Sequence, residues 1–582
     1  MSQEQKLSYY INKAKSLDIA KYEKKIRIAL IGSFTLNGIE ETLRVKCSEM
    51  NVGCNSYVAG YNQYNQEILN KESNLYKFSP DVTFLILDIR SILGKLFHTP
   101  YLISETERKK FIDNKVSEIS NLIKSFTNNS KSKLVLTNLA IPTYSPYGIY
   151  ETKVAYGLQE MVNDYNQQIL AITKNVESVY VYDFNAFMTK FGEKNVFDFK
   201  QFFLGDVQIS FEYIPYLSHS LTGYVKAILG LNKKCIVLDL DNTLWGGIVG
   251  EDGFEGINLG GDPVGKAFAE FQKLLLSIHK RGILLAINSK NNFEDAIHVI
   301  REHSEMVLKE EHFACMKINW NDKVQNMKEI ANDLNIGLDS MIFFDDDPVN
   351  CEYIKSSFPQ VMTVTMPKDT SQYVPLLMSL NDFDILKITE EDLGRGNMYL
   401  QEKQRKDLEH QATNLDDFLQ QLAINLKIKK ANDFTIPRIS QLTLKTNQFN
   451  LTTKRYQDED IRKFIDSGNW VGCAQVQDKF GDSGITGVFI VKKNPTEWII
   501  DTFLLSCRIM GRGIENGILS EILKKAKEAG VKSVVGEFIP TKKNAPCANF
   551  FSDYGFKKIG QYWVFDMNNP IKTPKHLSCS VE

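Results

Sequence analysis

Two aspartates separated by one residue, Asp239 and Asp241, directly follow the apolar run from Cys235 to Leu238. A short run of this kind indicates a buried parallel strand. Open α/β sheets bind their ligands at the carboxyl ends of strands, so both carboxylates are expected in a site. Neighbouring carboxylates repel each other unless a cation lies between them, and the pair therefore predicts a Mg²⁺ ion. The alternative is a strand whose aspartates only cap the next helix.

Three later segments carry polar side chains that fit the same kind of site. Ser289 ends one apolar run, and Asp345 and Asp346 end another. Lys323 stands between these two segments. The order and spacing of the four motifs resemble those of the haloacid dehalogenase (HAD) superfamily, whose members mostly transfer phosphoryl groups.

The resemblance implies a role for each of these side chains. Asp239 would be the nucleophile that accepts the phosphoryl group, and Asp241 would be the general acid and base. Ser289 would hydrogen-bond the transferring phosphate, while the charge of Lys323 would offset phosphate and carboxylate charge. The implied Mg²⁺ ligands are Asp239, Asp241, Asp345 and Asp346.

Composition limits the classes of protein to consider. A chain of 582 residues is too long for one core and favours three or four domains. A net charge of −2 gives no long-range attraction to nucleic acid or to an anionic membrane. The start lacks the apolar core of a signal peptide, no run reaches membrane-spanning length, and the nine cysteines lack zinc spacing. We therefore expect a cytoplasmic protein with reduced thiols, no membrane insertion and no nucleic-acid partner.

Residues 1–230 alternate strand-like and helix-like segments, the pattern of a doubly wound α/β domain. Ser33 follows the first expected strand and Asn138 the third, as in SGNH-type hydrolases, which this domain resembles. The aspartate of that family between glycine and serine is missing, so Ser33 is interpreted as a helix cap rather than a nucleophile. The expected strands are 26–31, 82–87, 133–137 and 179–182.

Residues 231–370 are expected to form a Rossmann-like HAD domain. The stretch between its first two motifs is mostly one helix, 266–281, which leaves little room for a cap domain. The domain therefore resembles the capless HAD branch, whose open site admits tethered or macromolecular substrates. Residues 371–425 have apolar positions at helical spacing and predict a helical connector with a solvated, charged face.

Residues 426–566 carry a second pattern suited to phosphate. A strand-like run, 498–505, precedes a glycine-rich loop and a helix that begins near Ile514. Glycines let backbone N–H groups approach a pyrophosphate, and a helix N-terminus favours its charge. The loop resembles the coenzyme A loop of GNAT acetyltransferases, which have an α+β fold, and residues 567–582 are expected to be a tail. The loop residues implied to bind the cofactor are Arg508, Gly511, Arg512 and Gly513.

SGNH-like, capless HAD and GNAT-like domains in this order resemble the FkbH-like proteins. The strings 238–247, 444–452 and 506–508 are the most particular marks of that resemblance. Characterised members load a glyceryl unit from 1,3-bisphosphoglycerate onto an acyl carrier protein, for instance in polyketide biosynthesis. The resemblance implies a phosphorylated three-carbon acid as donor, an enzyme thioester, and the phosphopantetheine arm of a carrier protein (or coenzyme A) as cofactor.

A cysteine must carry the acyl group in that scheme. Cys507 is the predicted residue, because it adjoins the glycine-rich loop and Arg508 would favour its thiolate. Cys315 and Cys547 are alternatives, and Cys235 is expected in the core.

Two other functions fit the same sequence. One is a Mg²⁺-dependent phosphatase that acts on a small phosphoester, with water as the final acceptor. The other is an acetyl-CoA-dependent N-acetyltransferase in surface glycan or secondary-metabolite biosynthesis.

Overall fold

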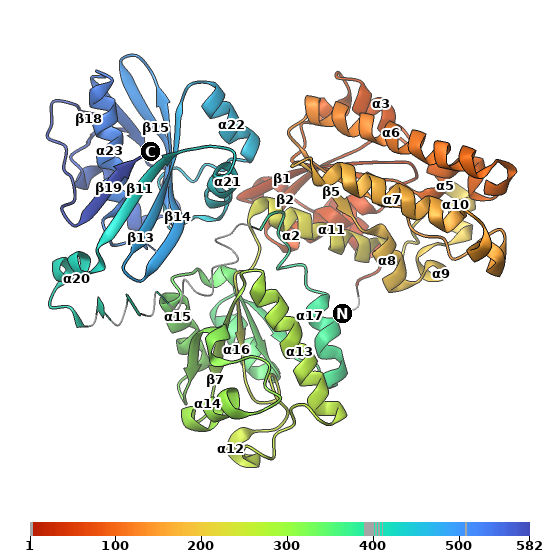
Figure 1. Ribbon diagram of the computed structural model, residues 1–582, viewed down its shortest axis with the longest axis horizontal. Helices are drawn as coiled ribbons and strands as arrows, with labels where there is room; N and C mark the ends of the chain where they lie inside the picture. Colours follow the sequence, from red (N-terminus) through yellow and green to blue (C-terminus); the bar gives the residue numbers. More distant parts are fainter. Residues whose placement is uncertain (1–3, 389–400, 402–403, 406–407, 410, 507–508) are drawn as a thin grey trace. The chain divides into compact units, whose positions relative to one another are not determined.

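The computed structural model describes residues 4–388, 401, 404–405, 408–409, 411–506 and 509–582. The chain forms two compact units, one that ends at Val225 and one that begins at Lys226. Three separate sheets, two of them wholly parallel, give the multidomain α/β fold that the sequence predicts (Figure 1). Among the described residues, no helix is both long and apolar enough to cross a membrane.

Five parallel strands form the sheet of the N-terminal unit, in the order β2-β1-β3-β4-β5. The four strands expected from the sequence are confirmed, and β2 is an additional one. Their bounds are β1 Lys24–Gly32, β2 Val52–Val58, β3 Val82–Ile86, β4 Lys133–Thr137 and β5 Val179–Tyr182.

Helices cover both faces of this sheet, as a doubly wound fold requires. Helices α6 and α7 contribute to one core with strand residues such as Leu85. On the opposite face Tyr224 of α11 meets the ring of Phe84. The helices are α1 Leu7–Lys15, α2 Ile39–Glu49, α3 Tyr64–Leu69, α4 Asn74–Phe78, α5 Ile89–Leu93, α6 Glu105–Asn129, α7 Leu158–Lys174, α8 Phe184–Phe191, α9 Glu193–Val196, α10 Phe199–Gly205 and α11 Ile214–Leu229.

The HAD-like domain has its own five-stranded parallel sheet, in the order β10-β9-β6-β7-β8. Between β6 and β7, where every residue is described, the chain forms only the helices α12 and α13. This arrangement agrees with the expectation that the domain has no separate cap. The elements are β6 Cys235–Leu238, α12 Val249–Asp252, α13 Pro263–Lys280, β7 Leu284–Ser289, α14 Phe293–Glu302, β8 Phe313–Ile318, α15 Lys323–Asp333, β9 Met341–Asp345, α16 Pro348–Ser357, β10 Met362–Thr365 and α17 Tyr373–Met378.

The connector expected at residues 371–425 is shorter than predicted. Tyr373, Leu377 and Phe383 are buried in the core of the HAD-like domain, so that domain continues past residue 370. At the other end, Phe418 and Leu422 of α20 are buried in the core of the C-terminal domain. Helical spacing locates the apolar face of a helix, but it does not say which domain buries that face.

The C-terminal domain contains a mixed sheet of nine strands, in the order β17-β18-β16-β15-β14-β13-β11-β19, with β12 paired to β15. The predicted strand before the glycine-rich loop (β15) and the helix after it (α23) are both present. The elements are α20 Leu415–Leu422, β11 Ile424–Lys430, α21 Ile436–Lys445, β12 Phe449–Asn450, α22 Asp458–Asp466, β13 Trp470–Asp478, β14 Gly481–Lys493, β15 Glu497–Leu505, α23 Ile514–Glu528, β16 Ser533–Glu537, α24 Phe550–Asp553, β17 Lys557–Ile559, β18 Tyr562–Asp566 and β19 Leu577–Val581.

The predicted tail at residues 567–582 is not a tail. Its last segment is the strand β19, which pairs in parallel with β11 from Ile424 to Ile428. Leu577 is buried in the same core as the rest of the domain. The prediction was wrong because β19 is short and pairs with a strand that is distant in the sequence.

Candidate active site of the HAD-like domain

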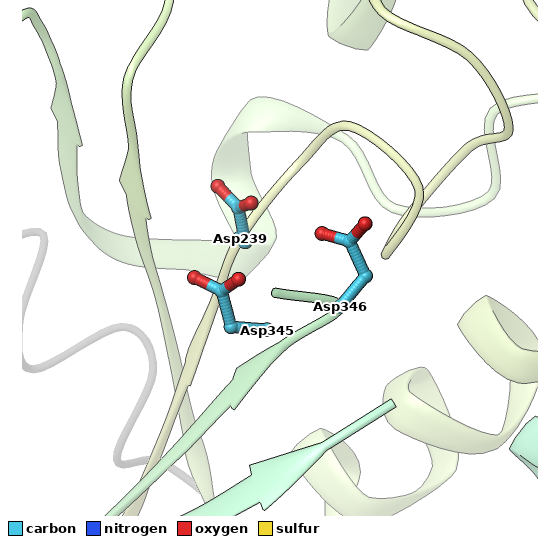
Figure 2. Close-up of side chains that lie close together, drawn as sticks. All are labelled: Asp239, Asp345 and Asp346. Carbon is cyan, nitrogen blue, oxygen red and sulfur yellow. The ribbon is translucent and has the colours of Figure 1, made fainter. Parts of the chain in front are cut away.

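Adjacent strands bring the predicted acids together. Strands β6 and β9 pair in parallel, with Leu238 opposite Phe344, so Asp239 and Asp345 extend from the same edge of the sheet. Asp346 follows directly. Each of these three aspartates offers an oxygen within 4.8 Å of those of the others. Figure 2 shows the three carboxylates close together.

Lys323 is the cation of this cluster. Its ammonium nitrogen lies 3.0 Å from Asp239 Oδ1 and 2.6 Å from Asp345 Oδ2. The side chain is only 4% exposed. Burial alone would lower the pKa of Lys323, but the charges of Asp239 and Asp345 outweigh burial and raise it. Lys323 is therefore charged at neutral pH.

Burial and neighbouring negative charges oppose the ionisation of Asp345 and Asp346. Burial first, and then the charges of Asp239 and Asp345, raise the pKa of Asp346 to about 6. Burial and the charge of Asp239 also raise the pKa of Asp345, although Lys323 opposes the shift. Three carboxylates with one ammonium group leave two negative charges uncompensated in a largely buried site.

The donor set fits a divalent cation. Carboxylate oxygens are the ligands that Mg²⁺ prefers, and an ion of charge +2 would cancel the uncompensated charge. Asp239, Asp345 and Asp346 are the residues that would hold it. Asp345 is also fixed from behind by the backbone N–H of Asp347 at 2.9 Å and the amide of Asn350 at 3.2 Å.

Asp241 lies outside this group of acids. Its Oδ1 accepts hydrogen bonds from Trp245 Nε1 at 2.9 Å and from the backbone N–H of Val249 at 3.1 Å. Its Oδ2 accepts from the Asn291 amide at 2.9 Å. Nothing in this geometry supports the expectation that the Asp241 carboxylate also binds the metal, because its oxygens already accept three hydrogen bonds.

Asn291 connects two predicted residues that the sequence did not relate. Its amide nitrogen also lies 3.3 Å from Ser289 Oγ, so it spans Ser289 and Asp241. Ser289 is 1% exposed, at the end of β7. The only signal for Asn291 in the sequence was its place two residues after a strand that ends in a hydroxyl group.

A buried pair of asparagines positions Lys323. Asn288 donates from its amide to the backbone carbonyl of Lys323 at 2.9 Å, and Asn326 donates to Asn288 Oδ1 at 3.1 Å. Both asparagines are fully buried. Helix α15 begins with Lys323, after Asp322 caps its first turn by accepting from Val324 N–H.

The predicted coenzyme A loop of the C-terminal domain is only partly supported. Cys507 and Arg508 lie outside the described residues. Gly511 and Gly513 have φ of 78° and 72°, the left-handed region that glycine adopts without strain. The side chain of Arg512 is buried, with Nη1 3.9 Å from Asp478 Oδ2, so its guanidinium is not available to hold a phosphate as expected.

Cys547 and Cys235 are poor nucleophiles in this fold. Burial raises the pKa of Cys547 to about 11, and that residue is 2% exposed. Burial likewise raises the pKa of Cys235, which lies inside β6 as expected. Cys315 is half-buried, with its sulfur 3.7 Å from Asp333 Oδ2. All described cysteines are free thiols.

Ser33 is neither a helix cap nor an exposed hydroxyl. It is fully buried, and its hydroxyl donates to Asp88 Oδ2 at 2.7 Å and accepts from the Asp88 backbone N–H at 3.0 Å. The next helix begins after Gly38, so the interpretation of Ser33 as its cap was wrong. Asn138 donates instead to Asp183 Oδ1 at 2.8 Å.

Comparisons with known proteins agree with the first two domains. Residues 27–226 match the family described as FkbH, N-terminal domain. None of the curated proteins compared matches the chain. The chain is similar to the solved N-terminal part of the protein BF1531 from Bacteroides fragilis, which contains a phosphatase domain and is complexed with Mg. The identity is 28%, the match covers 66% of this chain and 100% of that one, and the TM-score is 0.61.

Weaker matches are to GNAT acetyltransferases. One from Staphylococcus aureus is 13% identical, with 24% of this chain and 99% of that one covered and a TM-score of 0.20. One from Elizabethkingia anophelis with acetyl-CoA bound is 18% identical, with 23% and 78% covered and a TM-score of 0.18. Scores this low support no argument about this chain. Residues 27–226 therefore belong to the FkbH N-terminal domain family, and the domain that follows them is similar to the phosphatase-containing part of BF1531.

Proposed function

We propose that this protein dephosphorylates an acyl-phosphate donor of the 1,3-bisphosphoglycerate type and transfers the hydroxyacyl group to an acyl carrier protein. The observation that carries the proposal is the largely buried cluster of three aspartates, two of which pair with Lys323. Such a cluster is suited to holding a phosphate ester, since it combines a nucleophile with cation sites. The site has no cap domain, which leaves room for a tethered substrate.

The phosphoryl step uses residues of the HAD-like domain. An oxygen of Asp239 forms a bond to phosphorus as the bond from phosphorus to the donor oxygen breaks. Asp241 gives a proton to that leaving oxygen and later takes one from the water that cleaves the aspartyl phosphate. Lys323 and Ser289 stabilise the charge of the transferring group. A Mg²⁺ ion held by Asp239, Asp345 and Asp346 would supply further charge stabilisation when bound.

The acyl step uses a thiol. The Cys507 thiolate attacks the acyl-phosphate carbonyl, a thioester forms, and phosphate leaves with the electron pair of the broken bond. The phosphopantetheine thiol of a carrier protein then attacks the thioester and regenerates Cys507. An acyl phosphate is already activated, so no ATP is required.

Intact-protein mass spectrometry tests both steps. The full chain is incubated with Mg²⁺ and with 1,3-bisphosphoglycerate generated in situ. Wild type should gain a glyceryl adduct, Asp239→Asn should retain an adduct heavier by one phosphoryl group, and Cys507→Ala should gain none. Matched controls are Asp295→Asn, an exposed acid of α14, and Cys579→Ala, a half-buried thiol of β19, and both should behave as wild type.

Hydrolysis alone is the second candidate function. It is favoured by the match to BF1531, whose solved part contains a phosphatase domain. Release of phosphate that Asp239→Asn abolishes, without an adduct on any of the proteins, would select this function and refute acyl transfer. An adduct on Cys507→Ala would instead indicate that Cys315 or Cys547 carries the thioester.

A further inference from the structure

The N-terminal domain contains a cavity that the HAD-like site does not use. Its volume is about 290 Å³. It is lined by Phe34 after β1, by Asp88 after β3, by residues 140–143 after β4 and by residues of α5, α8 and α9. The cavity therefore lies at the carboxyl edge of the parallel sheet, where open α/β folds bind small molecules.

Arg90 is the basic residue of the cavity wall, and aromatic rings surround its guanidinium. The guanidinium carbon lies 4.3 Å from the ring centre of Phe97, 5.0 Å from that of Phe197 and 5.4 Å from that of Phe202. No residue that the structure describes forms a hydrogen bond or ion pair with this guanidinium. Its planar fork of N–H donors is thus held in place by stacking, without an acceptor from the protein.

Asp88, the acid whose charge acts most on Arg90, forms no ion pair with its guanidinium, and the oxygens of Asp88 already have other donors. Asp88 Oδ1 accepts from the backbone N–H groups of Arg90 at 2.9 Å and Ser91 at 3.1 Å, since Asp88 caps α5. Asp88 Oδ2 accepts from Ser33 Oγ at 2.7 Å. The buried Ser33 therefore fixes Asp88 as a helix cap, while Arg90 lines the cavity.

Glu193 supplies an acceptor in the same cavity wall. One of its oxygens, Oε2, accepts from the backbone N–H of Thr143 at 3.1 Å and from the Thr143 hydroxyl. Within the described part of the chain, its other oxygen accepts no hydrogen bond. The cavity thus combines one cationic fork, one acceptor oxygen and an aromatic wall.

We propose that this cavity binds a small organic hydroxy- or amino acid. Its carboxylate pairs with the guanidinium of Arg90, its apolar body packs on Phe97 and Phe197, and its hydroxyl or amino group donates to Glu193. A planar monoanion matches the guanidinium fork in two parallel hydrogen bonds. A phosphate dianion fits less well, since Asp88 and Glu193 would repel its second charge.

Calorimetric titration of the full chain with 3-phenyllactate tests the proposal. Wild type should bind it, and Arg90→Met should bind at least about tenfold more weakly, because a charge-assisted pair is lost. Arg90→Lys should bind between these two, since it keeps the charge but loses the fork. The matched control is Arg27→Met, because Arg27 also stacks on a ring, that of Phe78 at 4.7 Å, but does not line the cavity.

A second comparison tests the acceptor. Glu193→Gln should weaken the binding of 3-phenyllactate. The affinity for 3-phenylpropionate, which lacks the hydroxyl, should stay close to that of wild type. Thermal unfolding of each variant verifies that the domain is folded. The proposal is overturned if wild type binds no carboxylate, if the neutral 3-phenyllactamide binds as tightly as the acid, or if folded Arg90→Met retains full affinity. Binding of inorganic phosphate in preference to the acids would also overturn it.

Discussion

Replacing Lys323 by methionine is expected to destabilise the metal-free protein strongly. Methionine keeps the length and the apolar stem of lysine but removes the charge. Lys323 is 4% exposed, and its ammonium lies 3.0 Å from Asp239 and 2.6 Å from Asp345. Without it, the clustered carboxylates are buried with no cation among them. Removing one partner of such a buried ion pair costs about 3–5 kcal/mol in the free energy of unfolding.

Lys317→Met provides the matched control in the same domain. Lys317 also contacts two acids, Glu329 and Asp333, both at 3.0 Å. Its side chain is 21% exposed and those of its partners are 37% and 42% exposed, so water screens these pairs. Surface pairs of this kind contribute about 1 kcal/mol or less.

Urea unfolding of both variants in chelator, followed by far-UV circular dichroism, measures the difference. Saturating Mg²⁺ should restore part of the stability of Lys323→Met, because a divalent cation replaces the lost charge. Equal losses in the two variants would refute the reasoning, as would a loss below about 1 kcal/mol for Lys323→Met.

Three further predictions concern other contacts. Mg²⁺ should raise the thermal midpoint of wild type, with little effect on Asp345→Asn in the same calorimetric scans; an equal rise in both would remove Asp345 from the metal ligands. Trp245→Phe should lower kcat for phosphate release about tenfold, because the indole hydrogen bond to Asp241 is lost while the ring stays packed; an unchanged kcat would show that this bond does not position Asp241. Burial would raise the pKa of Asp501, but hydrogen bonds and charges such as those of Lys492 outweigh it and lower that pKa. Asp501→Asn should therefore be less stable than wild type in urea unfolding at neutral pH, and the difference should shrink below about pH 4, as Asp501 becomes protonated in the folded state; a difference that does not vary with pH would contradict this.

The acids of the HAD-like site could be predicted from the sequence because they mark strand ends. An apolar run that stops at Asp239 or at Asp345 predicts both the strand and the edge from which the carboxylate extends. Parallel pairing then brings the two ends together without any need to know the loops. Asn291 was missed for the opposite reason, since its contact with Asp241 depends on the path of a loop.

Some residues that make functional contacts cannot be told from ordinary core residues in the sequence. Trp245 is fully buried and would be counted as a core residue, yet its indole nitrogen orients Asp241. Arg512 is the opposite case. A basic residue in a glycine-rich loop suggests phosphate binding, but the side chain of Arg512 is buried in the domain next to Asp478. Residue type alone does not distinguish these cases, because each depends on a partner distant in the sequence.

The pairing of β19 with β11 has a consequence for the order in which the C-terminal domain assembles. Strand β11 is synthesised long before β19 (Leu577–Val581). Until β19 is made, β11 can pair only with β13, on one of its two edges. Its other edge presents unpaired backbone groups, a template for another chain. Closing that edge requires a contact across most of the domain sequence, which is slow to form. Nascent or truncated chains that lack β19 should therefore be the species most prone to self-association.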